Sequence, residues 1–246
     1  MSIAKAGFYT PPIFFNNTVQ KQIEITPPQP PEKPIPTLGI QPQEQFNDFG
    51  TVLFEKYRPQ TFNEIIGQND IVQQIQKNIR NLPHMIFKGP PGTGKTTLAQ
   101  VIALYLNADI IILNGSDDRG INTIRGKVLN FVKHGSLHNR LKIIFFDEAD
   151  GLTQEAQDAL KSIMERYPRT VRYVFACNDI EAFIEPLRSR CNEYDFKRVL
   201  DSDIILRLHY INDKENLGNS NDVLQQITIK AKGDMRKAIN LLQGGG

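Results

Sequence analysis

One eight-residue segment constrains the fold more than any other part of this sequence. Residues 89–96 read Gly-Pro-Pro-Gly-Thr-Gly-Lys-Thr, which fits the phosphate-loop pattern of two glycines five apart followed by Lys and Thr. Roughly 0.01 such matches are expected by chance in a chain of this length at average residue usage. An apolar strand pattern precedes the segment, and a helical pattern with Leu98, Val101 and Ile102 follows it. This context predicts a phosphate-binding loop between a strand and a helix rather than an ordinary Gly/Pro turn.

The residue types in this loop suit the binding of a nucleoside triphosphate. The glycines let backbone N–H groups converge on phosphate oxygens at a helix N-terminus, where the partial positive charge favours an anion. We expect Lys95 to reach the β and γ phosphates and the Thr96 hydroxyl to ligate Mg²⁺. The predicted nucleotide contacts in this region are Gly89, Pro90, Pro91, Gly92, Thr93, Gly94, Lys95, Thr96 and Thr97.

A second segment, which ends in acidic residues, completes the predicted site. Residues 143–146 are apolar and end in Asp147 and Glu148, and carboxylates at the end of a buried strand need a partner. We expect Asp147 to hold the Mg²⁺ shell and Glu148 to polarise the water that attacks the γ-phosphate. The letters Asp-Glu-Ala-Asp at 147–150 also name a class of RNA helicases, which close a second ATPase domain over the nucleotide. Only 96 residues follow Asp150, too few for another such domain, so this sequence argues against that class.

The order of apolar patterns predicts an α/β fold. From Leu53 onward, short apolar runs alternate with amphipathic segments, as in a RecA-like parallel sheet covered by helices on both faces. A helix with Thr153 as its N-cap and an apolar face is expected to end before Pro168. The expected strands are 84–88, 109–113, 142–146, 172–177 and 193–196. Residues 201–243 predict three helices, beginning near Asp201, Asn221 and Asp234. We therefore expect an ATPase domain over 51–200 and a small helical lid domain over 201–246.

The first 50 residues differ in composition from the rest of the chain. Nine of the fifteen prolines fall there, and such a stretch favours extended conformations over a packed core, so we expect a disordered Pro-rich tail. It contains neither an arginine nor an apolar signal region, and the whole chain has no run of about 18 apolar residues. Cys177 and Cys191 are too few for a disulfide framework or a four-ligand zinc site. These features argue against secretion and against a membrane-embedded protein.

A local basic segment is the candidate surface for nucleic acid. Residues 119–142 contain six Lys or Arg and no Asp or Glu, although the formal net charge of the chain is only +2. Read as a helix, the segment places Arg125 opposite an apolar face, so Arg125 could track a phosphate backbone. The apolar positions of that reading are Ile121, Val128, Leu129 and Val132. The alternative is a solvated helix face.

Several motifs together resemble one family. Residues 53–243 resemble the AAA+ ATPases, and among them the small subunits of the replication factor C clamp loader. The resemblance rests on the segments 55–59 and 65–68, which look like the family's adenine-covering region, and on 113–121, which looks like its Leu-Asn-Ala-Ser-Asp-Asp-Arg-Gly-Ile element. It also rests on 187–191, which looks like its Ser-Arg-Cys box, and on 233–238, which looks like its second sensor. Two departures are Gly115, where the family usually has Ala, and Gly126 in the middle of a predicted helix.

The resemblance implies roles for individual residues. We expect contacts with the adenine base of ATP from Phe54, Arg58 and Ile66. Asn178, after a strand, is implied as the first sensor, with a turn-forming Asn as the alternative. Arg236, in the first turn of a helix, is implied as the second sensor, with a solvated arginine as the alternative. Arg190 is implied as an arginine finger that acts on a neighbouring subunit, with an ion pair within the chain as the alternative. Arg125, Lys127 and Lys161 are implied as DNA contacts.

The resemblance also implies a function. It predicts a subunit that binds ATP, Mg²⁺ and primer–template DNA within a hetero-pentamer of clamp loader subunits. Such a subunit opens and loads the sliding clamp of a DNA polymerase and hydrolyses ATP on release, in the nucleus or at a viral or cytoplasmic replication site. The collar domain that follows the lid in this family is not expected within this sequence. The alternatives are another AAA+ DNA motor, such as a branch-migration helicase, and a nonhydrolysing scaffold subunit.

Overall fold

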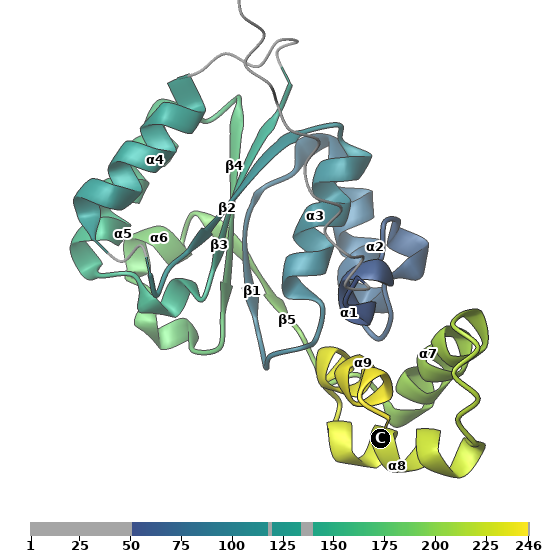
Figure 1. Ribbon diagram of the computed structural model, residues 1–246. Helices are drawn as coiled ribbons and strands as arrows, with labels where there is room; N and C mark the ends of the chain where they lie inside the picture. The colour runs from purple at the N-terminus through teal and green to yellow at the C-terminus, as the bar shows by residue number, and fades with distance from the viewer. Residues whose placement is uncertain (1–50, 118–119, 134–139, 246) are drawn as a thin grey trace, which may run out of the picture. The chain divides into compact units, whose positions relative to one another are not determined.

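The computed structural model describes residues 51–117, 120–133 and 140–245 (Figure 1). All of these belong to one unit, Phe49–Gly246. The predicted Pro-rich tail lies outside the described residues. Among the residues that are described, no helix is long and apolar enough to cross a membrane.

A five-stranded parallel sheet forms the centre of the ATPase domain. Its strands are β1 (His84–Lys88), β2 (Asp109–Asn114), β3 (Lys142–Asp147), β4 (Val171–Cys177) and β5 (Cys191–Asp195). They lie in the order β2-β3-β4-β1-β5. The first four match the predicted strands within one residue at each end, whereas β5 begins two residues before the predicted start. Because β1, β3 and β4 are neighbours and parallel, the loops after their carboxyl ends meet at one edge of the sheet.

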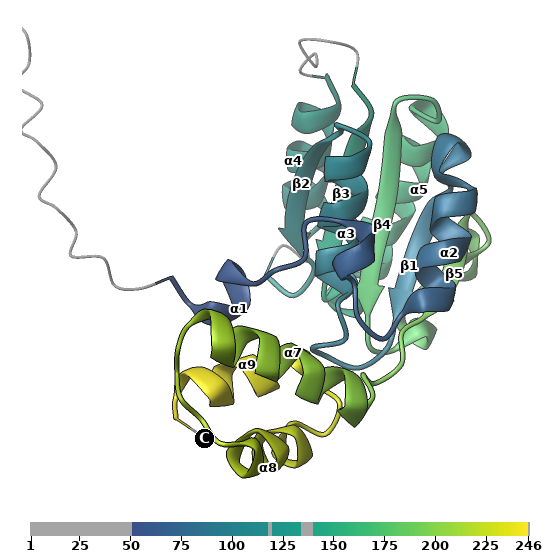
Figure 2. The same ribbon diagram turned by 90° about the vertical axis from the view of Figure 1, so that its right-hand side faces the viewer.

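Helices cover both faces of this sheet (Figures 1 and 2). On one face lie α2 (Asn69–Lys77) and α3 (Lys95–Tyr105), and on the other lie α4 (Ile121–Lys133), α5 (Gln154–Arg166) and α6 (Glu185–Arg188). Within the described residues, four short 3₁₀ helices connect these elements: η1 (Phe62–Glu64), η2 (Ile79–Asn81), η3 (Ala149–Gly151) and η4 (Ile180–Ala182).

Successive residues of the central strands enter different cores. Phe145 packs on the α3 side of the sheet, and its neighbour Phe146 packs on the α5 side. Both are fully buried, which is why these strands are apolar throughout rather than alternating. Burial on both faces of the sheet thus explains the continuous apolar runs in the sequence.

Helix α5 forms as predicted. The Thr153 side chain accepts a hydrogen bond from the Ala156 N–H at 3.3 Å, which satisfies one of the free donors of the first turn. The helix ends at Arg166, two residues before Pro168. Its buried residues are Ala156, Gln157, Leu160, Ile163 and Met164.

The C-terminal part forms a three-helix lid around its own apolar core. Its helices are α7 (Asp201–Lys214), α8 (Asn221–Ala231) and α9 (Met235–Gln243), and they start where the sequence predicts. The short helix α1 (Leu53–Lys56) also contributes to this core through Leu53. No pattern in the sequence predicted that α1 packs with the lid rather than with the sheet.

Two expectations for the basic segment are wrong. Ile121, the first residue of α4, is 37% exposed, although it lies two turns before Val128 on the same face of the helix. The buried residues of α4 are Ile124 and Val128. Lys142 is buried, and its Nζ donates to the carbonyl of Phe131 at 2.6 Å and to that of Val132 at 3.2 Å. Lys142 therefore caps the C-terminus of α4 instead of presenting its charge on the surface.

Candidate nucleotide site

The phosphate loop connects β1 to α3 at the edge where the neighbouring strand ends meet. Gly94 is the N-cap of α3, with a φ of 97° that favours glycine. The chain can therefore turn sharply into the helix, so that the first free N–H groups of α3 face the cleft above the loop. This arrangement suits an anion such as a phosphate.

Lys95 is the cation of the loop, and it is half-buried. Its Nζ donates to the carbonyls of Gly89 at 2.6 Å and of Pro90 at 2.9 Å. Burial lowers the pKa of Lys95, and the nearby Asp147 carboxylate acts in the opposite direction. The ammonium is held by neutral carbonyls, so it has positive charge to offer to a phosphate.

The two predicted Mg²⁺ ligands are in direct contact. The Thr96 hydroxyl donates to Oδ2 of Asp147 at 2.9 Å, although the two residues are 51 positions apart in sequence. Oxygen ligands of this type suit Mg²⁺, which is usually held by one or two protein groups together with substrate phosphates. The residues present fit such an ion.

Glu148 and Asn178 border the same cleft. Glu148 follows β3 in the left-handed region, with a φ of 49°, and its carboxylate-bearing side chain is exposed at the cleft. A non-glycine residue in this conformation is uncommon and is held there only where the surroundings require it. Asn178 follows β4, and its N–H donates to Oδ2 of Asp150 at 3.4 Å. The ends of β3 and β4 thus bring a carboxylate and an amide together.

The opposite wall of the cleft is apolar and comes from the N-terminal segment and the lid. The Arg236 guanidinium lies 5.8 Å from the centre of the Phe54 ring. Arg58 Nη1 donates to Thr97 Oγ1 at 3.5 Å, which connects the N-terminal segment to α3. The apolar residues of this wall include Phe54, Ile65, Ile66, Val199, Met235 and Ile239.

Most predicted ATP contacts line this one cleft. They are Phe54, Arg58, Ile66, Pro91, Gly92, Thr93, Gly94, Lys95, Thr96, Thr97, Asn178 and Arg236, together with Asp147 and Glu148. Gly89 and Pro90 do not line it, and their carbonyls instead bind the Lys95 ammonium. The cleft combines a polar end for phosphates with an apolar end for a base.

Arg190 lies outside this cleft, immediately before β5. Its Nη2 is 2.6 Å from Oε1 of Glu165 on α5, and its Nη1 donates to the Pro186 carbonyl at 2.6 Å. The isolated chain thus has the intrachain ion pair that was predicted from the sequence as the alternative to an arginine finger. A residue that acts on a neighbour is not expected in its own cleft, so its role as a finger stays a prediction.

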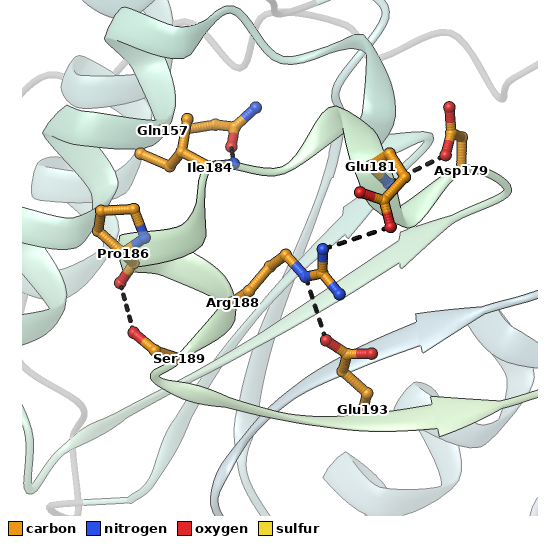
Figure 3. Close-up of polar contacts among 8 residues, drawn as sticks. All are labelled: Gln157, Asp179, Glu181, Ile184, Pro186, Arg188, Ser189 and Glu193. Carbon is orange, nitrogen blue, oxygen red and sulfur yellow. Dashed lines mark hydrogen bonds and ion pairs between the residues drawn. The ribbon is translucent and has the colours of Figure 1, made fainter.

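The turn that carries Arg190 is held by a polar network (Figure 3). Arg188 Nε lies 3.2 Å from Oε1 of Glu193, and its Nη1 lies 3.4 Å from Oε1 of Glu181. The fully buried Gln157 accepts the Ile184 N–H at 2.9 Å. These contacts hold α6 against α5 and β5.

The predicted DNA contacts lie on two adjacent helices. Arg125 and Lys127 are exposed on α4, and Lys161 is half-buried on α5. Helices α4 and α5 pack side by side on one face of the sheet (Figure 1). Contact of these side chains with DNA stays a prediction.

Sequence reasoning missed one buried residue beside the phosphate loop. Gln68 is 4% exposed, and its side-chain amide pairs with the backbone of Lys197, donating to the carbonyl at 2.7 Å and accepting the N–H at 3.3 Å. It also donates to the Thr93 carbonyl at 3.4 Å. Gln68 thereby connects the loop to the segment before the lid. In the sequence it is followed by the polar residues Asn69 and Asp70, so no local signal predicts its burial.

Comparison with protein families agrees with this architecture. The family described as "ATPase family associated with various cellular activities (AAA)" matches residues 85–199, and the "RCF1/5-like, AAA+ ATPase lid domain" matches 206–244. The chain belongs to the AAA family of ATPases, which confirms the predicted parallel sheet with helices and a lid.

Its similarity to individual proteins confirms the more specific resemblance. The chain is 41% identical over 198 residues to a replication factor C small subunit of Archaeoglobus fulgidus, covering 77% of this chain and 62% of that protein. It is 42% identical over 197 residues to the one of Staphylothermus marinus, covering 77% and 60%. The chain therefore spans about three fifths of the length of these relatives.

Solved structures share the fold at lower identity. The Thermotoga maritima RuvB Holliday junction branch migration motor superposes with a TM-score of 0.67 and 22% identity, covering 76% of this chain and 64% of that chain. At this identity the likeness concerns the fold alone.

Proposed function

We propose that this chain is an ATP-hydrolysing subunit of a clamp loader. The observation that carries the proposal is the contact of Thr96 with Asp147 at 2.9 Å in a cleft that Lys95 and Glu148 also line. The identity of about 40% to archaeal replication factor C small subunits supports the clamp loader within the wider family.

The residues of the cleft divide the work of hydrolysis. Lys95 binds the β and γ phosphates, and Thr96 and Asp147 hold Mg²⁺, which supplies charge neutralisation at the phosphate oxygens. Glu148 orients and polarises the attacking water, and the neutral Asn178 amide binds that water or a γ-phosphate oxygen. Arg236 binds the phosphates from the lid, where a bound anion offsets the unfavourable position of a cation in the first turn of α9.

The partners follow from the resemblance and from two surface features. We propose that Arg190 acts at the ATP site of a neighbouring subunit in a hetero-pentamer, because it lies outside its own cleft. We propose that Arg125, Lys127 and Lys161 bind the backbone of primer–template DNA, and that the ring opens and loads a sliding clamp. The proposed location is a site of DNA replication, the nucleus among them.

The two alternatives have less support. The likeness to a branch-migration motor concerns the fold at 22% identity, so it gives no argument for that activity. A nonhydrolysing scaffold has no need for Lys95, Glu148 and Asn178 around one cleft.

Two matched variants test the proposed function. Lys95→Ala removes a phosphate contact and should abolish MgATP binding by the purified chain, as measured by calorimetry. Glu148→Gln keeps the shape of the side chain but removes the base, so it should preserve binding and suppress hydrolysis. Glu155→Gln, at an exposed position outside the cleft, is the control for a lost carboxylate. Equal MgATP affinity in wild type and Lys95→Ala would contradict the assignment of the cleft as an ATP site. MgATP binding by the wild type without turnover in the assembled complex would favour the nonhydrolysing scaffold.

A further inference from the structure

The helix α1 is structurally part of the lid, although almost the whole ATPase domain separates the two in sequence. Leu53 is 7% exposed and packs in the lid core with Leu208 and Ile239. Its N–H donates to Oε1 of Gln243, in α9, at 2.9 Å. An apolar contact and a backbone hydrogen bond thus dock the start of α1 on α9.

A second set of contacts docks the other end of α1 on α7. The Tyr57 hydroxyl donates to the Glu215 carboxylate, and Lys56 Nζ lies 2.7 Å from Oε1 of the same residue. Arg207 Nη2 donates to the Tyr57 carbonyl at 2.7 Å. We call these four residues, Lys56, Tyr57, Arg207 and Glu215, the α1 clasp.

The aromatic ring of Tyr210 supports the clasp from α7. It meets the Tyr57 ring edge-on with a centroid distance of 6.0 Å, and the Arg207 guanidinium lies 5.3 Å from its centre. Each clasp residue is therefore held by more than one neighbour, which restricts its rotamers.

The protonation states keep the central pair intact at neutral pH. Burial, and then the hydrogen bond to Glu215, raise the pKa of Tyr57 to about 12. Hydrogen bonds from Lys56 and Tyr57 lower the pKa of Glu215 below its ordinary value. A neutral phenol therefore donates to an ionised carboxylate, which is the stronger form of this hydrogen bond.

The clasp adjoins the apolar wall of the cleft. Phe54 is part of α1, lines the cleft, and lies 5.8 Å from the Arg236 guanidinium of α9. Tyr57 and Arg207 line the same cleft. Phe54 and Arg236 are thus carried by one small core, so the wall for the base and the cation for the phosphates belong to one body.

We propose that the α1 clasp is a positioning device for the nucleoside base, with Tyr57 and Glu215 as positioning residues that set the affinity for ATP through Phe54. The proposal rests on the proposed function, because it assumes that the cleft binds ATP. Its specific claim is that the clasp acts on the base more than on the phosphates. Lys95 and Thr96 lie on the phosphate loop, and Arg236 lies on α9, whereas the clasp contacts join α1 to α7.

Two variants and two ligands test the claim. Tyr57→Phe removes only the hydroxyl, and Glu215→Gln removes only the charge. The ligands are MgATP and magnesium tripolyphosphate, which has the phosphates but no base, and binding to the purified full chain is measured by calorimetry. We expect each variant to weaken MgATP binding about 3- to 10-fold and to leave tripolyphosphate binding within about 2-fold of wild type.

Three further variants serve as controls. Asp213→Asn removes an exposed carboxylate from the same helix, two residues from Glu215, and should change neither affinity. Lys95→Ala should weaken both ligands, because both need the phosphate loop. The double variant Tyr57→Phe/Glu215→Gln should lose less than the product of the single losses, because both changes break the same contact.

The outcomes separate this inference from the proposed function. MgATP affinity equal to wild type in both clasp variants would overturn the inference alone. Equal losses for MgATP and tripolyphosphate would also overturn it, because the clasp would then act as general support for the lid. A wild-type chain that binds neither ligand would overturn the proposed function and the inference with it.

Discussion

Gly92 of the phosphate loop lies against Asp234 at the start of α9: a Cβ atom on residue 92 would meet Oδ1 of Asp234 at 1.8 Å. The Met235 N–H donates to the Gly92 carbonyl at 3.1 Å, and Asp234 itself caps α9 by accepting the Lys237 N–H at 2.9 Å. The loop and the lid therefore touch through backbone and a capping carboxylate, at a point where only glycine fits.

Gly92→Ala should separate these two elements. The added methyl group must displace the Asp234 cap, and the φ of 71° adds strain of about 1–2 kcal/mol. We expect a clear fall in melting temperature and at least a tenfold loss in MgATP affinity. Gly218→Ala is the matched control, since Gly218 has a φ of 70° with nothing within 4 Å of the added atom. Equal destabilisation by the two variants would show that strain alone matters at position 92.

The environment of His84 leads us to predict that the folded protein loses stability in mild acid. The Nδ1 atom of His84 accepts the Tyr173 N–H at 3.1 Å, and burial followed by the Arg172 charge lowers the pKa of His84 from 6.5 to about 4. Because the folded pKa is the lower one, this contribution is complete above pH 6.5 and is lost as the pH falls towards 4. The loss amounts to at most about 3–4 kcal/mol at 1.36 kcal/mol per pKa unit.

Denaturant unfolding between pH 7 and 4 measures this effect. His84→Asn keeps an acceptor for the Tyr173 N–H but cannot titrate in this range, so its stability should depend less on pH than that of wild type. An NMR titration of His84 provides the direct check. An apparent pKa near 6.5 in the folded protein would contradict the prediction.

The sheet and the phosphate loop could be predicted from the sequence, because both leave local sequence patterns. The buried strands are continuous apolar runs, and the loop is a motif between a strand and a helix, so no distant contact is needed to recognise them. The contacts of Gln68 and of the α1 clasp could not be predicted in this way, because they join residues far apart in sequence. Gln68 pairs with Lys197 at a separation of 129 residues, and Tyr57 pairs with Glu215 at a separation of 158. Their partners are set by how the lid packs, which no local pattern records.

Gly115 shows how packing gives meaning to a departure from the family pattern. A Cβ atom on this residue would meet the Glu148 carbonyl at 2.5 Å, and the Gly115 N–H donates to the Asp147 carbonyl at 2.7 Å. The missing side chain lets the end of β2 approach the backbone of the predicted catalytic glutamate. From the sequence alone, Gly115 was a substitution without a reason.

Reversing the charge of Arg125 tests the DNA surface. If Arg125 on α4 contacts a phosphate, Arg125→Glu should weaken primer–template binding about equally for all sequences and reduce its salt dependence, because fewer counterions are released. ATP hydrolysis without DNA should change little, since Arg125 does not line the nucleotide cleft. Lys230→Glu, at an exposed position of α8, makes the same charge change and is the control. Fluorescence anisotropy at several salt concentrations measures both quantities, and equal slopes for Arg125→Glu and wild type would identify a solvated helix face.

The contact between Arg190 and Glu165 defines the last test. Both side chains are partly exposed, and a surface ion pair of this kind contributes only about 0–1 kcal/mol, so Arg190 can exchange Glu165 for a phosphate of a neighbouring site. Arg190→Ala leaves the chain's own cleft intact, and ATP binding by the isolated chain should stay nearly unchanged. Hydrolysis in the assembled complex should fall steeply, because the transition state at the adjacent interface loses a positive charge.

Mixing subunits decides whether Arg190 acts on a neighbour. Arg190→Ala subunits retain an intact phosphate loop, and Lys95→Ala subunits retain an intact Arg190, so the mixture should recover part of the activity that each lacks alone. Arg166→Ala, which removes an exposed arginine next to Glu165 on α5, is the control and should keep normal turnover. ATPase rates measured over a range of protein concentrations should rise with assembly. Hydrolysis by a monomer that is independent of concentration and unaffected by Arg190→Ala would show that the Arg190–Glu165 pair is only structural.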